Sequence, residues 1–386
     1  MILGAITYFF ILSSFVVPSP SILDLKSYAI KGINKDRAKF GLPPVIIDDD
    51  NAAAQAHANE LLKTQTVSHW TTDGMKPYMR YSLYGGHDNV VQNLAQEKYD
   101  LVNLSVWNNN NNENQQRQEG QLSNDPFNHI RLAMCKAGIV LCDNLINTCK
   151  AINNLEYSMM YQDAGCCQDG HRMNILDKHH NYVSIGIAYN KFYLVLVQNF
   201  EDKYTVWKRP ISYDKTSNTV SMSGSITSNT MSLSDLVIRY EPLPSKQIYE
   251  NNKNRKSYNE GQIVARVIPH MVATSINELQ TYVDNTQLIQ ASKSILACST
   301  STADNKGVTK FEISFSIGEL IKKYGHGVYT IDTWYKPMNN NPFQASSVSL
   351  HKLKRSSIML IINNIQTIFS YEVYLGNSRR LIHQWI

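Results

Sequence analysis

The feature that most constrains this chain is a pair of closely spaced apolar segments between residues 183 and 197. In the first, Val183, Ile185 and Ile187 alternate with small residues, and in the second, Phe192 to Val197, both alternating positions are apolar. A strand that is apolar on both faces has to be covered by other layers on each side. These segments therefore predict a central sheet with helices packed on both faces.

Two helices are predicted before this sheet. From Ser21 onward apolar residues recur at helical spacing, and the pattern stops at residues 41–44, Gly-Leu-Pro-Pro. An Ala-rich helix is expected from Ala52 to about Thr64, and the acidic turn at residues 48–50 is suited to cap it. After it, residues 79–83 alternate apolar and polar side chains, which favours a short half-buried segment.

Polar side chains with chemical capability lie close to these elements. His171 stands in a Gly-flanked polar turn directly before the apolar strands, and a loop held by a rigid sheet is the usual position of a site. Arg80 is expected to brace a loop through hydrogen bonds to carbonyls. His57, inside the Ala-rich helix, is expected to be a packed or surface residue and not a ligand.

Several short motifs occur together in a characteristic order. They are Ile33-Asn34, Arg37-Ala38, Gly41-Leu42-Pro43-Pro44, Ser68-His69 with Asp73-Gly74, Arg80, Gly85-Gly86, Gln92-Asn93-Leu94-Ala95 and Gly170 to Leu176 with Ile185-Gly186-Ile187-Ala188. Over about residues 24 to 201 this order resembles the CAP superfamily (cysteine-rich secretory protein, antigen 5, pathogenesis-related 1; SCP domain) in its prokaryotic form. The resemblance implies a three-layer α-β-α sandwich. It also implies a cleft with two histidines and two acidic residues, which in some members binds a divalent metal.

The resemblance assigns the cleft residue by residue. His69 and His171 match the two histidines, Gln92 stands at the first acidic position, and Glu156 falls near the second, with Asp163 as the alternative. The amide at position 92 is a departure from the family pattern, because a neutral carbonyl holds a transition metal more weakly than a carboxylate does.

The residue chemistry leaves two interpretations open. His69, His171 and Glu156 could hold Zn²⁺ with a water as the remaining ligand, and such a water could act as a nucleophile. The two histidines fit equally well as hydrogen-bonded cleft residues that fix loops to the sheet.

The class of protein is limited by the length of the chain, its charge and its N-terminal segment. With 386 residues, 43% of them hydrophobic, two globular domains are expected. A net charge of +5 with dispersed Lys and Arg does not indicate a nucleic-acid partner. Residues 1–23 are uncharged and apolar, typical of a signal peptide or a membrane anchor, so we expect a protein that is secreted or anchored at the outer face of the cytoplasmic membrane.

Export would permit disulfides among the six cysteines. Cys135, Cys142 and Cys149 recur every seven residues, and a bridge from this segment to Cys166 or Cys167 is expected in preference to a bond between the adjacent pair. No CxxC pair supports a structural zinc site there. Residues of about 105–150, rich in Asn and then in Cys, are expected to form an insertion.

The pattern changes after residue 202. Seven short strands and one short helix, Ile317–Tyr324 closed by Gly325, favour an antiparallel β-sandwich domain over residues 203–351, while residues 352–386 carry no clear structural pattern. The fold class is thus α+β, a CAP-like domain at residues 24–202 followed by a β-sandwich. Appended domains of this kind more often bind or space than catalyse.

We therefore expect an exported binding or interaction module whose partner is a small ligand or an extracellular protein. The alternatives are a protease-like, metal-dependent hydrolase that uses His69, His171 and Glu156, and a structural protein of the cell envelope. Gln92, together with the lack of an evident nucleophile and general base, favours the binding module over an enzyme.

Overall fold

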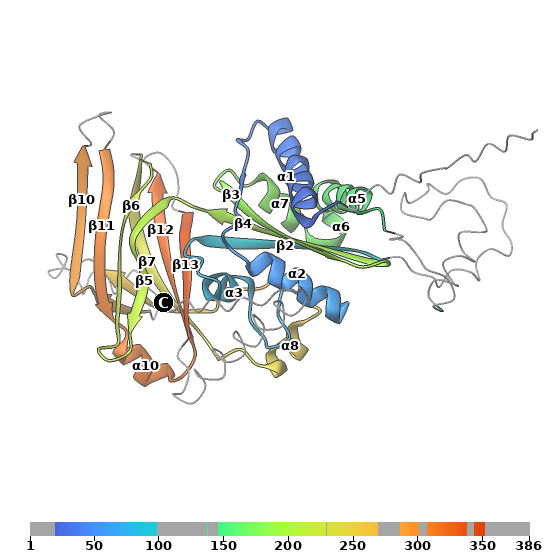
Figure 1. Ribbon diagram of the computed structural model, residues 1–386. Helices are drawn as coiled ribbons and strands as arrows, with labels where there is room; N and C mark the ends of the chain where they lie inside the picture. The colour runs from blue at the N-terminus through green and yellow to red at the C-terminus, as the bar shows by residue number, and fades with distance from the viewer. Residues whose placement is uncertain are drawn as a thin grey trace, which may run out of the picture.

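The computed structural model describes residues 20–98, 137, 146–228, 230–268, 286–300, 307–337 and 343–351. Helices surround one sheet in the N-terminal part, and the C-terminal part contains two further sheets (Figure 1), which confirms the α+β class. The predicted export segment up to residue 19, most of the predicted insertion and the tail after residue 351 lie outside the described residues. None of the described helices combines the length and apolar character needed to cross a membrane.

The first sheet has the strand order β1-β3-β4-β2. Strand β1 (Ile46–Ile47) runs parallel to β3 (Tyr182–Tyr189), and β4 (Tyr193–Asp202) is antiparallel both to β3 and to β2 (Asn89–Lys98). Every residue of β4 is buried. The prediction of a central, two-sided strand is therefore confirmed, and β2 forms one edge of the sheet.

Helices cover both faces of this sheet (Figure 1). On one face α1 (Ile22–Lys39), α5 (Thr148–Tyr161) and α7 (Gly170–Leu176) pack against residues such as Ile185 and Leu196. On the other face α2 (Ala53–Thr64) packs against Val195 and Val197. A Cβ at Gly186 would lie 2.1 Å from the carbonyl oxygen of Ala54, so the glycine permits this close approach of α2.

Two details concern the start of each helix. Ser21 and Asp24 form a capping box that begins α1 as expected. The acidic turn does not cap α2, because Asp48 pairs instead with Lys203 at 2.7 Å. The side chain of Asn51 accepts the N–H of Ala53 at 2.9 Å and takes the place of the predicted acidic cap.

Arg37 fixes α1 to the segment around α7. Its side chain is fully buried, and it donates hydrogen bonds to the carbonyls of Ile175, Asp177 and His180 at 2.8, 2.8 and 3.1 Å. A planar guanidinium can satisfy several carbonyls at once. The end of α7, the helix that carries His171, is thereby held against α1.

The C-terminal part contains a four-stranded sheet, β10-β11-β6-β5, and a five-stranded sheet, β13-β12-β7-β8-β9. The strands are β5 (Thr205–Asp214), β6 (Thr219–Ile226), β7 (Met231–Glu241), β8 (Gln262–Ile268), β9 (Gln287–Gln290), β10 (Lys293–Thr300), β11 (Gly307–Ser316), β12 (Val328–Pro337) and β13 (Phe343–His351). One hydrophobic cluster joins both sheets, with Val220 and Phe315 from one and Ile238 and Ile331 from the other.

Three expectations for this part need correction. Strands β9 and β10 were not predicted, and a second helix, α8 (Lys246–Asn252), accompanies the predicted α10 (Gly318–Tyr324). The pairing of β8 with β9 is parallel, so the strands are not purely antiparallel. A parallel pair needs a long crossover connection, and the chain between these two strands is long enough to provide one.

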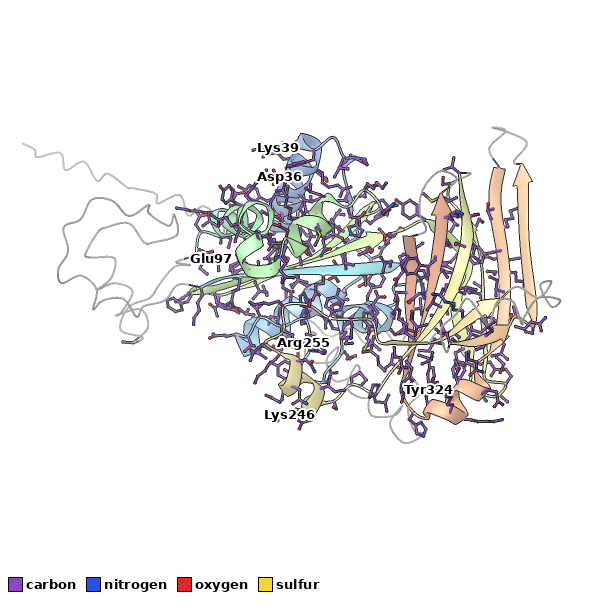
Figure 2. The ribbon with its side chains drawn as sticks, turned by 180° about the vertical axis from the view of Figure 1, so that it is seen from behind. Asp36, Lys39, Glu97, Lys246, Arg255 and Tyr324 are labelled. Atoms are coloured by element: carbon purple, nitrogen blue, oxygen red, sulfur yellow. A yellow bond between two sulfur atoms is a disulfide. The ribbon has the colours of Figure 1, made fainter. Side chains whose placement is uncertain are left out.

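The two parts of the chain are in contact through α3 (Pro77–Leu83) and the segment that follows α8. Ser82 accepts the N–H of Ser349 in β13 at 3.0 Å. Helix α8, marked by Lys246 in Figure 2, lies on the side of the first sheet that α2 and α3 cover. Consistent with this placement, a Cβ at Gly74 would lie 2.4 Å from the carbonyl oxygen of Ser245.

Candidate functional site

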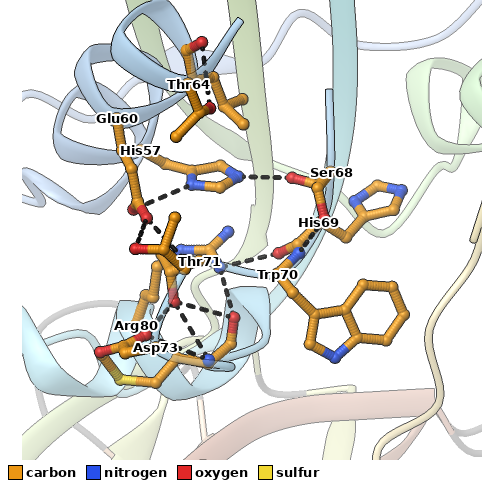
Figure 3. A network of polar contacts seen from close by, with 12 residues as sticks. His57, Glu60, Thr64, Ser68, His69, Trp70, Thr71, Asp73 and Arg80 are labelled. Atoms are coloured by element: carbon orange, nitrogen blue, oxygen red, sulfur yellow. Dashed lines mark hydrogen bonds and ion pairs between the residues drawn. The ribbon is translucent and has the colours of Figure 1, made fainter. Parts of the chain in front are cut away.

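The loop of residues 65–76, which carries His69, is held by side chains of α2 and α3 (Figure 3). His57 donates from Nε2 to the carbonyl of Ser68 at 2.9 Å, and Glu60 accepts the N–H of Thr72 at 2.6 Å. Arg80 donates to the carbonyl of His69 at 2.8 Å. The predictions that His57 is packed and that Arg80 braces a loop are confirmed.

The hydrogen bonds around Gln92 fix the tautomer of His69. Oε1 of Gln92 accepts from Arg80 at 3.3 Å, and its Nε2 donates to Asn199 at 3.0 Å. Because a guanidinium can only donate, the amide oxygen has to face Arg80. The same oxygen lies 3.1 Å from Nδ1 of His69, so Nδ1 carries the proton and Nε2 keeps its lone pair.

His69 is neutral near neutral pH. The pKa of its imidazole is lowered to about 4, mainly by burial and also by the charges of His57, Arg80 and His171, while the hydrogen bond that it donates to Gln92 acts in the opposite direction. A neutral imidazole with a free Nε2 is the form that binds a metal ion.

His171 is held in the same way by a different partner. Its Nδ1 lies 2.7 Å from Oδ1 of Asp163, and its backbone N–H donates to Oδ2 at 2.7 Å. A carboxylate only accepts when ionised, so Nδ1 carries the proton here too. Among the described residues, Nε2 of His69 and Nε2 of His171 have no hydrogen-bond partner, and neither atom is sealed from solvent.

Glu156 is not gathered with these residues. It projects from α5 and accepts a hydrogen bond from Gln198, on the sheet face that α1, α5 and α7 cover, whereas Gln92, the partner of His69, bonds to Asn199 on the opposite face. Burial raises the pKa of Glu156 to about 8, and the nearby charge of Asp36 adds to the shift. The set of His69, His171 and Glu156 stays a prediction, and Asp163, the alternative to Glu156, is the carboxylate that contacts His171.

Tyr258, from the second part of the chain, packs against the side chain of His69. The two ring centroids lie 5.0 Å apart, and the Tyr258 hydroxyl accepts the N–H of Gln92 at 3.2 Å. Burial raises the pKa of this phenol. Sequence reasoning missed Tyr258, because no local pattern marks a residue whose role depends on contact between distant segments.

Two cysteines, Cys166 and Cys167, lie beside Asp163, the residue that bonds to His171. Cys166 and Cys167, both in α6 (Ala164–Cys167), are joined by a disulfide, and Cys149 is free among the described residues. The expectation of a bridge from Cys166 or Cys167 to the segment of Cys135, Cys142 and Cys149, in preference to a bond between the adjacent pair, is therefore wrong. Cys135 and Cys142 themselves lie outside the described residues. Both cysteines of the pair belong to the short helix α6, which places their side chains beside Asp163.

No family model matches this chain, and no curated protein matches it in sequence.

Proposed function

We propose that this chain is an exported binding module whose cleft, built around His69 and His171, takes a divalent metal ion such as Zn²⁺. The observation that carries the proposal is that the two imidazoles have the same tautomer and the same kind of hydrogen bond. Each donates from Nδ1 to an oxygen acceptor, Gln92 or Asp163, and each leaves Nε2 open. Such outer partners orient metal-binding histidines and set their tautomer.

The ligand set explains why binding is favoured over hydrolysis. Two imidazole nitrogens would leave the remaining positions of a tetrahedral Zn²⁺ ion to water or to a small ligand. A hydrolase also needs a general base near the metal-bound water, and Glu156 contacts Gln198 instead of the cleft. The protease-like alternative therefore has less support than the binding module.

The proposal includes a fold and a location. We infer that helices on both faces of the first sheet form a CAP-like three-layer sandwich, and that the two C-terminal sheets form a β-sandwich domain. The uncharged apolar run of residues 1–23 supports export or anchoring outside the cytoplasmic membrane.

Calorimetric titration with Zn²⁺ tests the proposal. With Cys166 and Cys167 oxidised, the wild type should bind one equivalent of Zn²⁺ that is lost in the double variant His69→Ala, His171→Ala. His179→Ala is the matched control, because His179 also forms an ion pair with an aspartate, Nδ1 to Asp177 at 3.0 Å, outside the cleft. Equal Zn²⁺ uptake by the wild type and the double variant would reject the proposal.

A further inference from the structure

A second cluster of possible metal-ligand atoms lies at α6, next to Asp163, the hydrogen-bond partner of His171. The sulfur atoms of Cys166 and Cys167 and a carboxylate oxygen of Asp163 all lie within 4.8 Å of one another. Asp163 is buried, Cys167 is half-buried and Cys166 is exposed. The carboxylate side of the cluster is therefore buried, and the cysteine side faces solvent.

The types of these ligand atoms select a class of ion. Thiolate sulfur is a soft ligand that favours Zn²⁺ and similar ions over Mg²⁺ or Ca²⁺, which prefer oxygen. Two thiolates and one carboxylate supply three of the four positions of a tetrahedral ion, and water can fill the fourth. The histidine cleft uses neither sulfur atom.

Asp163 is already oriented for such a role. Its Oδ2 accepts the backbone N–H groups of His171 and Arg172 at 2.7 and 3.3 Å, which fixes the carboxylate at the start of α7. Its Oδ1 accepts from Nδ1 of His171. A carboxylate held by three donors needs little reorganisation to present an oxygen to an ion beside it.

We propose that Cys166, Cys167 and Asp163 form a thiol-dependent binding site for a soft divalent metal ion of the zinc type, distinct from the histidine cleft. On binding, each thiol releases a proton to solvent and each sulfur forms a bond to the ion. The sulfur pair binds only as thiols. The two sulfurs are joined in this structure, and a phosphine reductant with one water breaks the S–S bond, yields two thiols and becomes the phosphine oxide.

Cadmium titration of the full chain tests this site, because Cd²⁺ binds thiolates as Zn²⁺ does and its thiolate complexes absorb in the ultraviolet. After phosphine reduction without oxygen, the wild type should bind one Cd²⁺ more than the variant Cys166→Ser, Cys167→Ser. Cys149→Ser, which alters a cysteine outside the cluster, should bind as the wild type does. The double variant His69→Ala, His171→Ala should keep the thiolate absorbance.

Asp163→Asn should weaken Cd²⁺ binding at this site about tenfold while the thiolate absorbance remains. A second measurement needs no variant: Cd²⁺ should protect Cys166 and Cys167 of the wild type from alkylation, as mapped by mass spectrometry. Equal Cd²⁺ uptake with and without the two cysteines, or equal alkylation with and without Cd²⁺, would overturn the proposal.

Discussion

The ring of Tyr258 packs edge-on against the ring of His69, with the centroids 5.0 Å apart and the planes at 61°. Tyr258 belongs to the connection between α8 and β8, whereas His69 belongs to the loop after α2. The site is therefore built by both parts of the chain, and the C-terminal part contributes to the environment of the histidine as well as to the fold.

Removing this ring should change the titration of His69. Burial is the main cause of its lowered pKa, so Tyr258→Ala should move the pKa of His69 from about 4 upward, toward its usual value of 6.5. Tyr258→Phe keeps the ring and loses only the hydroxyl that accepts from Gln92, so it should leave the pKa nearly unchanged. NMR titration of the histidine side chains measures both, and an unchanged pKa in Tyr258→Ala would show that the ring does not shield His69.

The amide at position 92 should control the charge of His69. In Gln92→Glu a carboxylate would replace the oxygen that Nδ1 contacts, and an anion beside an imidazole stabilises its protonated form. The pKa of His69 should rise, and Zn²⁺ affinity at neutral pH should increase because an ionised partner strengthens the histidine ligand. Gln96→Glu, an exposed position on the same strand, is the control. An equal effect from both substitutions would assign the change to net charge alone.

Glu156 should make the folded state less stable as the pH rises from about 4.5 to about 8. Its pKa is about 8 in the folded protein against an ordinary 4.5, so the folded state holds the proton more tightly than the unfolded state does. The favourable contribution is complete below about pH 4.5 and is lost as the pH rises toward 8. Glu156→Gln should therefore be more stable than the wild type by a few kcal/mol at pH 8, on the order of 1.4 kcal/mol per unit of pKa shift.

Chemical denaturation across pH 5 to about 8 measures this difference. Glu319→Gln, at an exposed glutamate of α10, is the control and should give a pH profile parallel to that of the wild type. A gap between wild type and Glu156→Gln that stays constant with pH would contradict the assignment.

The interface between the two parts should depend on Lys76. This buried ammonium pairs with Glu241 and donates to the backbone and side-chain oxygens of Asn259 at 2.7 and 2.9 Å. Lys76→Met would leave Glu241 buried without its cation, and breaking a buried pair in this way costs about 3–5 kcal/mol.

Thermal unfolding should show this loss, and Lys76→Met combined with Glu241→Gln should recover part of it. Lys253→Met removes the exposed pair with Glu250 and should change stability little. A Lys76→Met protein as stable as the wild type would mean that the ion pair does not hold the interface.

Much of the N-terminal sheet and its helices follows from local patterns. Residues of α1 and α2 repeat at helical spacing, and the two-sided apolar run of β4 requires cover on both faces. The alternation around Met79 predicted a short half-buried segment, whereas the structure has a helix, α3, that is buried on nearly all sides by contacts that include β2 and β13. Burial by a distant sheet erases the one-sided pattern on which the helical interpretation depends.

The candidate site was only partly predictable. His69, Gln92 and His171 follow from motifs, but spacing alone does not tell on which face of a sheet a helix residue such as Glu156 ends. Asp163 proved to be the carboxylate beside His171, and Tyr258 carried no local signal at all. The contact of Tyr258 with His69 depends on long-range packing, which a single sequence does not encode in any short pattern, whereas Asp163 lies only eight residues before His171 and was already the alternative to Glu156.

The central claim is that one ion is shared by two imidazoles through their Nε2 atoms. Anomalous diffraction at the zinc absorption edge, from oxidised crystals grown with Zn²⁺, tests it most directly. We predict a single peak at about 2.0–2.1 Å from Nε2 of His69 and from Nε2 of His171. A peak bound to only one of these rings, or no peak in the cleft at saturating Zn²⁺, would contradict the claim.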